Sequence, residues 1–262
     1  VPDIKIGETI EEEVTPKDFG RVAAATAKQV VVQKIREAER NSIMEEFGDK
    51  QDELLVGTVA LEDTDNYFID LGRTNGILPK KDCIPGETLE MGSQIKVYVT
   101  KIEEGQKGGP VIILSRTHPG FVKCLFQREV PEIEQGIVEI KNIAREAGSR
   151  TKIAVYSRDP NVDPIGSCIG PKGIRKNNIT AEIKGEKIDI IKYSENAEEF
   201  IRAALSPAQV VSVTETGERS CSVLVEDDQL SLAIGKEGQN ARLAARLTGW
   251  KIDIKSDGGA LQ

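Results

Sequence analysis

The chain has 262 residues and a formal net charge of −8, with 39% hydrophobic, 30% charged and only 4% aromatic residues. This composition is typical of a globular protein with two to four small domains, and no apolar run approaches the length that would cross a membrane. The acidic balance excludes a generally basic binder of nucleic acid, so any such contact must depend on local basic clusters. Its four cysteines are scattered without a C-x-x-C pair, which favours reduced thiols and a cytoplasmic protein.

The first predicted element is one long helix over residues 16–47. Thr15 offers a cap-like hydroxyl and Pro16 occupies the first helical position. Apolar residues then recur at helical spacing until Gly48, which predicts the end of the helix. Such a helix is about 45 Å long. Its charged stretch at residues 36–40 favours a solvated spacer over a binding helix.

Residues 53–116 change to period-two strands separated by Gly, Pro, Asn and Asp, and we expect a turn at residues 72–79. The predicted strands are 55–59, 67–71, 94–99 and 111–114. Short strands at this spacing predict a small closed barrel, and the strings around them resemble the OB barrel of the ribosomal S-one type. Phe68 matches one of the two base-stacking aromatics of such barrels, but Asp65 occupies the other position. We therefore expect at most a weak RNA face at Phe68, with a scaffold role at least as well supported.

Residues 119–126 predict a short linking helix, and the rest of the chain divides into two α-β-β-α-α-β units. The first unit is expected to contain a helix at 132–146, a strand at 152–157, helices at 163–169 and 174–183, and a strand at 187–192. The segment 148–152 offers little for a further strand, so we expect a smaller sheet there. The second unit is expected to contain a helix at 195–204, strands at 208–214 and 220–226, helices at 228–234 and 239–247, and a strand at 250–255. The linker at 193–196 is so short that the units should pack rigidly and present one groove.

Each unit contains the same short glycine motif, and the two copies lie 65 residues apart. Both motifs have the form G-x-x-G, follow an isoleucine and carry a lysine between the glycines. Glycine lets a sugar-phosphate chain approach closely, and the helix that follows points free amides and its positive dipole end at phosphates. One copy alone would equally fit a steric corner between two helices, but a matched pair favours the KH module, whose GXXG loop clamps four nucleotides of a single strand.

The candidate RNA-binding residues are those of the two loops and the first turns after them. In the first module they are Ile169, Gly170, Pro171, Lys172, Gly173 and Arg175. In the second they are Ile234, Gly235, Lys236, Glu237, Gly238, Gln239, Asn240, Arg242 and Arg246. We expect apolar groove walls from Ile169, Ile174 and Ile179 in the first module, and from Ile234, Ala241 and Ala244 in the second, although some of these must serve as core.

Little in the sequence indicates catalysis. The single histidine, His118, precedes a proline and is expected to pack or to cap a helix. One histidine and dispersed cysteines exclude the usual zinc spacings and a Ser-His-Asp triad. Most carboxylates are expected on solvated faces, and residues 226–228 should include a helix N-cap. We expect no enzyme, no cofactor and no metal site, while a metal-dependent nuclease built from these acids stays open as a weaker alternative.

Six strings, taken with the order long helix, OB barrel, KH, KH, resemble the NusA family of bacterial transcription termination and antitermination factors. They are QVVVQKIREAER at 29–40, LGRT at 71–74, EVPEI at 129–133, GEKIDI at 185–190, ALSPA at 204–208 and AIGKEGQN at 233–240. The resemblance implies a multidomain α+β protein with two tandem type II KH domains. It implies four regions: the tail of an N-terminal domain at 1–50, the barrel at 51–117, and KH domains at 118–193 and 194–262.

The resemblance also implies a function in which tandem KH domains contact nascent single-stranded RNA and modulate pausing, intrinsic termination and antitermination. The implied partners are RNA, RNA polymerase and other antitermination factors, with no membrane and a monomeric chain. The family's N-terminal head is expected to precede this sequence, and Lys176, Asn178 and Thr180 are more polar than the family's usual helix after the first loop. The alternative is an RNA-processing or ribosome-associated KH/OB protein, such as an accessory of an exoribonuclease.

Overall fold

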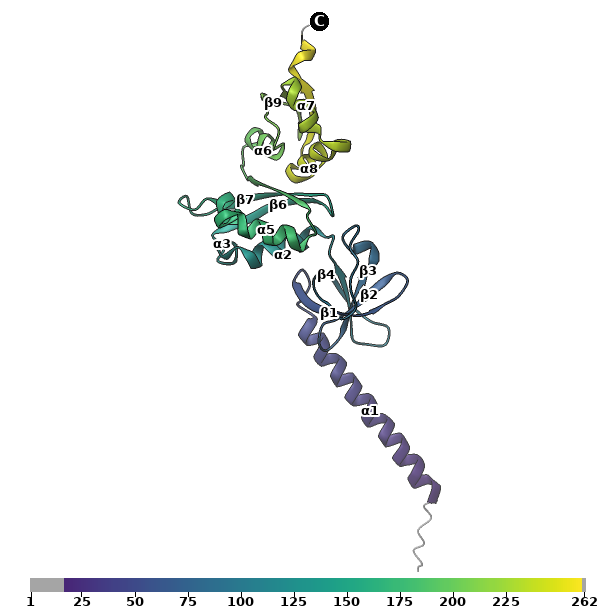
Figure 1. The fold of residues 1–262 in the computed structure, drawn as a ribbon. Helices are drawn as coiled ribbons and strands as arrows, with labels where there is room; N and C mark the ends of the chain where they lie inside the picture. Colours follow the sequence, from purple (N-terminus) through teal and green to yellow (C-terminus); the bar gives the residue numbers. More distant parts are fainter. Residues whose placement is uncertain (1–16, 261–262) are drawn as a thin grey trace, which may run out of the picture. The chain divides into compact units, whose positions relative to one another are not determined.

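The computed structural model describes residues 17–260, which divide into two compact units. One unit contains the N-terminal helix together with Glu104–Pro110, and the other contains Lys50–Glu103 and the chain from Val111 onward. Figure 1 labels the elements along the chain. Among the described residues, no helix is both long enough and apolar enough to cross a membrane.

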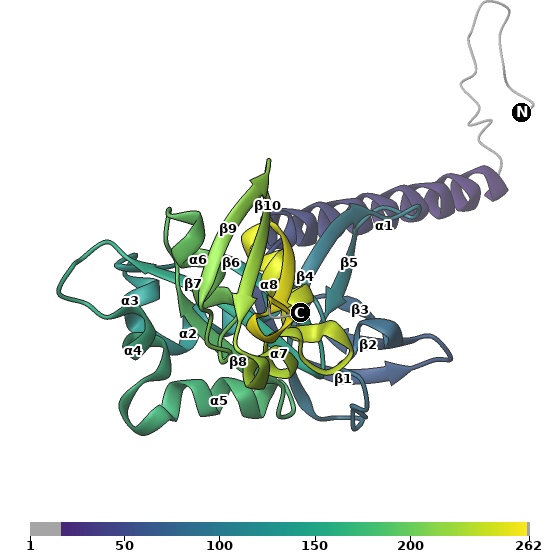
Figure 2. The ribbon, with the colours of Figure 1, turned by 90° about the horizontal axis from the view of Figure 1, so that it is seen from above.

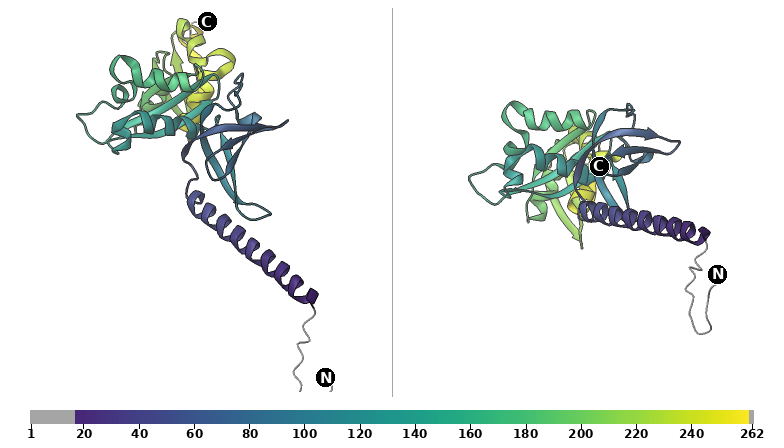
Figure 3. Two further views of the ribbon diagram at one scale, coloured as in Figure 1. Left: turned by 60° about the horizontal axis from the view of Figure 1, so that its bottom comes forward. Right: turned by 90° about the horizontal axis from the view of Figure 1, so that it is seen from below.

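The N-terminal helix α1 spans Lys17–Phe47, as the spacing predicts, and Figure 3 shows it as one unbroken helix. It ends where the N–H of Gly48 donates to the carbonyl of Met44 at 2.8 Å. The predicted cap at Thr15 and Pro16 lies outside the described residues. Within its unit, the side chain of Arg40 packs over Gly108 and Gly109, so it holds the base of the helix against the segment between the last two barrel strands.

Five strands close into the predicted barrel in the order β1-β2-β3-β5-β4. They are β1 Leu54–Glu62, β2 Asn66–Asp70, β3 Asn75–Pro79, β4 Gln94–Glu104 and β5 Pro110–Ser115. The short helix η1 Lys80–Asp82 lies between β3 and β4. The expected turn at 72–79 is confirmed only at 72–74, where the N–H of Leu71 donates to the carbonyl of Thr74. The expectation was wrong for the remaining residues, which form β3 and pair with both β2 and β5. Gly76 is needed there for packing, since a Cβ would lie 2.5 Å from a methyl of Leu114.

The first KH module contains a three-stranded sheet in the order β6-β7-β8, with β7 and β8 parallel. Its elements are α2 Pro119–Glu129, α3 Pro131–Glu134, β6 Val138–Glu146, β7 Arg150–Ser157, α4 Pro164–Ile169, α5 Ile174–Glu182 and β8 Lys187–Lys192. Residues 138–146 were expected to be helical and are a strand, so the sheet is not reduced. A bulge between Ile140 and Asn142 shifts the register, which leaves Ile140, Ile143 and Ala144 at a spacing that imitates a helix.

Helix α2 is an integral part of the first KH module, which corrects the expectation of a linker. Phe121, Val122 and Phe126 on this helix are fully buried and pack with β7 and α5 in one core. Leu54 and Tyr98 of the barrel belong to the same core. The barrel and the first KH module therefore share an apolar interior.

The second KH module repeats the topology of the first, with sheet order β11-β10-β9 and β10 parallel to β11. Its elements are α6 Ala197–Ala204, β9 Ser212–Gly217, β10 Ser220–Val225, α7 Asp227–Ile234, α8 Gln239–Thr248 and β11 Lys251–Ser256, after which the short helix η4 Asp257–Ala260 ends the described chain. Figure 2 shows β9 and β10 side by side, as their antiparallel register requires. The α+β class, the closed barrel and the tandem KH repeat are confirmed.

The sheet of the first KH module contributes to the core of the second. Ala144, Ala154 and Ile191, one from each strand of that sheet, pack with Phe200 and Leu243 of the second module. Beside them the buried ammonium of Lys152 donates to Asp189 at 2.9 Å and to the carbonyl of Ser206 at 2.7 Å. Burial lowers the pKa of Lys152. The two modules are thus joined by a common interior and by a buried charge, not by the short linker alone.

Candidate nucleic-acid interface

The two G-x-x-G loops have the same backbone conformation. The first glycines, Gly170 and Gly235, have φ/ψ of 74°/172° and 76°/170°. The second glycines, Gly173 and Gly238, have 75°/12° and 75°/13°. Each loop contains a single 3₁₀ turn, η2 Pro171–Gly173 and η3 Lys236–Gly238. Two segments of different sequence therefore adopt one geometry, which is what a repeated binding loop requires.

The two glycine positions of each loop differ in whether the fold leaves space for a side chain. A Cβ at Gly170 would lie 2.5 Å from Cγ of Arg175, and a Cβ at Gly235 would lie 2.7 Å from the backbone nitrogen of Asn240. The first glycine is therefore required by the fold. At Gly173 and Gly238 the nearest atoms to such a Cβ are 3.6 and 3.9 Å away, so these positions keep an open face on which a ligand backbone can lie.

Both loops lead directly into the N-terminus of a helix that receives no side-chain cap. Helices α2, α4 and α6 are capped by His118, Asp163 and Asn196. The N-caps of α5 and α8 are the second glycines of the loops, which have no side chain to accept from the helix amides. The amides of Ile174 and Gln239 donate to the carbonyls of Pro171 and Lys236, so only the amides after them are available to a ligand. Free amides and the positive end of the helix dipole attract phosphate oxygens. The loops thus offer two equivalent anion-binding helix ends.

The charged side chains of the two loops differ, although each loop has one lysine. Lys172 follows Pro171 and takes the left-handed conformation, which in the second loop is occupied by Glu237. Lys172 and Lys236 are exposed, and the ammonium group of neither has a hydrogen-bond or ion-pair partner within residues 17–260. The first loop is therefore the more positive, while Glu237 lowers the charge of the second.

In the first module the predicted cation beyond the loop is engaged within the protein. Nη1 of Arg175 donates to Glu132 at 2.8 Å and to the carbonyl of Ser167 at 2.7 Å. Its stem also fills the space beside Gly170. Arg175 therefore braces the first loop, and its charge is partly compensated by Glu132.

In the second module, Glu146 at the end of β6 collects the cations of α8. Its carboxylate accepts from Nε and Nη2 of Arg242 at 2.5 and 3.1 Å and from Gln239 at 2.9 Å, and Nη1 of Arg246 lies 3.6 Å away. The hydrogen bond from Arg242 lowers the pKa of Glu146, and the same bond raises that of Arg242. Three predicted RNA contacts thus converge on one carboxylate of the other module. The sequence analysis missed Glu146, because it is 93 to 100 residues away and belongs to a strand that was expected to be a helix.

Comparison with known proteins agrees with this arrangement. Residues 1–41 match the NusA N-terminal domain, residues 116–193 the NusA-like first KH domain and residues 197–262 the NusA-like second KH domain. A transcription termination/antitermination protein NusA of Halalkalibacterium halodurans is 52% identical over 99% of this chain and 68% of its own length. The chain belongs to the NusA family.

Two further relatives carry the same name. The NusA protein of Bacillus subtilis is 54% identical over 98% of this chain and 69% of its own length, and that of Thermus thermophilus is 46% identical over 97% and 66%. NusA-type proteins are thus similar to this chain through its helix, barrel and KH modules together.

One predicted site residue of this NusA-family chain is structural. Asn240 is 1% exposed, and its amide donates to the carbonyls of Leu205 and Ala233 at 3.1 and 2.9 Å. It fixes the second loop from inside and cannot face a ligand in this conformation. Its neighbour on the exposed side is Gln239, which contacts Glu146 and Ser149.

The predicted apolar walls divide between core and surface. Ile179 is 2% exposed and Ala244 is fully buried, so both belong to module cores. Ile174 is 53% and Ile234 is 37% exposed, and Ile169 is half-buried beside the first loop. The polar helix α5 nevertheless packs well, since Ile179 and Ile183 are buried and Asn178 donates to Glu129 at 2.6 Å.

On the barrel of this NusA-family chain, Phe68 lies in a cross-strand row of apolar side chains. It pairs with Leu61 of β1 and Ile77 of β3, and Ile77 pairs with Ile113 of β5. Leu61 is 59% exposed and Phe68 is half-buried, while Asp65 stands nearby at the surface. The row contains one aromatic side chain, and the position of the second base-stacking aromatic is occupied by Asp65.

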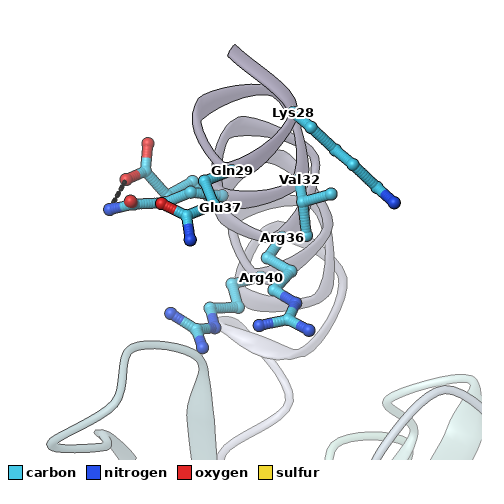
Figure 4. Close-up of a pocket in the computed structure, with 7 residues that line it drawn as sticks. Lys28, Gln29, Val32, Arg36, Glu37 and Arg40 are labelled. Atoms are coloured by element: carbon cyan, nitrogen blue, oxygen red, sulfur yellow. Dashed lines mark hydrogen bonds between the residues drawn. The ribbon is translucent and has the colours of Figure 1, made fainter. Parts of the chain in front are cut away.

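The polar side chains along α1 line a hollow on one side of that helix. Figure 4 shows Lys28, Arg36 and Arg40 along α1, with Glu37 on the same helix. The carboxylate of Glu37 accepts hydrogen bonds from Gln33 and Lys34. These side chains come from a single helix and do not converge. Nor is any group of three or more His, Cys, Asp or Glu in the described part of the chain arranged to hold a metal ion.

His118 acts as the cap that the sequence suggested. Its Nδ1 accepts from the N–H of Gly120 at 2.9 Å, and its ring stacks on Tyr98 with centroids 4.8 Å apart. Burial lowers the pKa of His118. The predicted N-cap at residues 226–228 is Glu226 by position, but its side chain makes no capping bond.

Proposed function

We propose that this chain binds single-stranded RNA along both KH modules, with phosphates at the two glycine loops and at the N-termini of α5 and α8. The observation that carries the proposal is the identical backbone geometry of two loops that each lead into an uncapped helix. The proposed contacts are Gly170, Pro171, Lys172, Gly173, Gly235, Lys236, Glu237, Gly238, Gln239, Arg242 and Arg246, with Ile169 and Ile234 as apolar neighbours and Arg175 as a brace.

The join between the modules supports binding of one continuous strand. Glu146 of the first module contacts the loop-bearing helix of the second, and Ala144, Ala154 and Ile191 extend the second core. Modules held in one relative position do not have to be ordered again when RNA binds, which reduces the entropic cost of engaging the second loop.

We further propose that the RNA is a nascent transcript and that the chain modulates pausing, termination and antitermination by bacterial RNA polymerase, as a non-enzymatic factor. Membership of the NusA family supports this role, since relatives across most of the chain are named transcription termination/antitermination proteins. RNA polymerase and other antitermination factors are its proposed protein partners. The domain divisions at 1–50, 51–117, 118–193 and 194–262 remain part of this proposal.

The loops are tested with Gly173→Asp and Gly238→Asp, alone and together. Both positions have space for a side chain, and although a φ of 75° disfavours residues other than glycine, Asp tolerates this left-handed conformation better than most, so we expect the fold to be retained while a carboxylate faces the phosphate. We expect each single variant to weaken binding of a labelled single-stranded RNA of about 12 nucleotides by tenfold or more at low salt, measured by fluorescence anisotropy. Wild-type affinity in the double variant, with an unchanged circular dichroism spectrum, would refute the groove.

A further inference from the structure

Three of the aromatic side chains that reach the surface in the described part of the chain lie in one region of the KH modules. The sequence has one tryptophan and four tyrosines. Tyr67 and Tyr98 are buried, whereas Tyr156 is 40% exposed and Tyr193 and Trp250 are half-buried. These last three lie at the junction of the KH modules. Tyr193 and Trp250 pack against the core of the second module but keep part of their rings at the surface. In a chain this poor in aromatics, such a group points to a binding surface.

A cavity of about 360 Å³ opens at this junction. The first module lines it with Asn142 and Tyr193, and the second with Phe200, Arg219 and Trp250. Its volume lies at the lower end of the range for pockets that take small planar ligands. Neither module forms it alone, so it exists because the modules are joined.

Contacts within the protein hold some of the lining side chains in place, whereas two of the lining polar groups have no hydrogen-bond partner in the described chain. Phe200 is buried and meets the ring of Tyr193 edge-on, with centroids 5.1 Å apart, which fixes that ring. Asn142 donates its amide to the carbonyl of Leu247 at 3.0 Å. Within the described chain, the guanidinium of Arg219 and the indole N–H of Trp250 have no hydrogen-bond partner. The cavity thus combines aromatic walls with two available donors.

Positive charge lies beside these rings. Nζ of Lys141 is 5.1 Å from the ring centroid of Tyr156 and 5.9 Å from that of Tyr193, and it also pairs with Glu139 at 2.9 Å. Glu195 lines the cavity as well and disfavours a free anion inside it. Aromatic faces with flanking cations suit a base whose phosphate stays outside, because every base has a π-face that can stack.

We propose that this junction is a second RNA contact, in which one unpaired nucleobase enters the cavity and stacks on Trp250 while Arg219 binds the adjoining phosphate. Tyr156 offers a stacking face for a neighbouring base. The proposal rests on the proposed function, since the same strand must first be held at the loops. Helix α8 is about 15 Å long, with the second loop at its start and the cavity at its end, so a few nucleotides of extended strand connect the two.

Trp250 is the only tryptophan of the chain, so its fluorescence reports on the cavity. The protein is titrated at low salt with oligouridylate and oligoadenylate of about 12 nucleotides, while the same RNAs, labelled, are followed by anisotropy. We expect saturable quenching of Trp250 by both RNAs. Arg219→Gln and Tyr156→Ala should each weaken binding about five- to tenfold. Lys251→Gln is the matched control, because it removes one exposed cation next to Trp250 that does not line the cavity.

The outcomes separate this proposal from the proposed function. If labelled RNA binds but Trp250 is not quenched, or if Arg219→Gln weakens binding no more than Lys251→Gln, the junction site is overturned and the loop site stands. If wild-type protein gives no saturable anisotropy change with either RNA, the proposed function itself fails. A quenching midpoint that is unchanged in both Arg219→Gln and Tyr156→Ala also overturns the junction site, since neither side chain then contributes to RNA binding.

Discussion

Glu146 is the carboxylate that contacts the cations of helix α8 in the second KH module, and its removal should strengthen RNA binding. It contacts Arg242 through two hydrogen bonds, at 2.5 and 3.1 Å, and it also faces Gln239 and Arg246. RNA phosphates must share these cations with it or displace it. Glu146→Gln keeps the size of the side chain and its ability to accept from Arg242, but removes the negative charge.

The size of the effect follows from Coulomb's law. A phosphate on the far side of the Arg242 guanidinium would lie roughly 6 Å from the Glu146 carboxylate, where repulsion in water is about 0.7 kcal/mol. Its removal should tighten binding about threefold at low salt and less at high salt. The side chains of Arg242 and Glu146 are 42% and 22% exposed, so solvent screens the pair and its removal should change stability little.

The assay is anisotropy of a labelled single-stranded RNA at several salt concentrations, in the wild type, Glu146→Gln, Arg242→Gln and the double variant. The gain from Glu146→Gln should shrink when Arg242 is already neutral, because the two charges act on the same phosphate. Thermal denaturation of each variant serves as the control. Weaker RNA binding in Glu146→Gln at unchanged stability would refute the reasoning, since Glu146 would then orient Arg242 for RNA instead of competing with the phosphate.

Three further predictions concern the barrel and the charged interior. Phe68→Ala should reduce RNA affinity in the anisotropy assay less than Gly238→Asp does; a larger loss would move the main site to the barrel. Burial lowers the pKa of His118 from 6.5, so wild-type stability is complete above pH 6.5 and falls as the pH drops through the folded value. The variant His118→Asn keeps a capping side chain and should lose less stability than the wild type over that pH interval, as measured by thermal melts. A loss equal to that of the wild type would contradict this role of His118. Glu186→Gln should cost about 3–5 kcal/mol in urea denaturation, because it leaves the buried guanidinium of Arg145 without its counter-ion; a cost below about 1 kcal/mol would be inconsistent with that pairing.

The buried ion pairs also explain how the barrel and first KH module are held together. The guanidinium of Arg145 donates to Glu186 and to the carbonyls of Arg116 and His118. Arg116 itself is 2% exposed and pairs with Glu87 at 2.7 Å. Desolvation lowers the pKa of Arg145, and Glu186 opposes that shift. Charges buried in this way are costly unless every donor is satisfied, so they specify one relative position for the segments that meet there.

Features that depend on interactions between residues close together in the sequence could be predicted from the sequence alone. Helical spacing up to Gly48 predicted where α1 ends, and period-two patterns predicted four of the five barrel strands. The repeated G-x-x-G motif predicted the tandem KH architecture. The loops were predictable because the glycine conformations and the helix start are properties of adjacent residues. Where a strand carries a bulge, as β6 does, the local spacing imitates a helix, and pattern alone gave the wrong element.

Which side chains are available to a ligand depends on how the modules pack and could not be predicted from local sequence. Asn240 and Arg242 are two residues apart on one helix, yet the first is buried under Leu205 and Ala233 and the second lies on the face that meets Glu146. Glu146 contacts α8 from the other module, and Arg219 and Trp250 line a cavity together with Asn142 and Tyr193 of the first module. Pairing of that kind depends on how one sheet packs on another module's helices, and no local pattern encodes it.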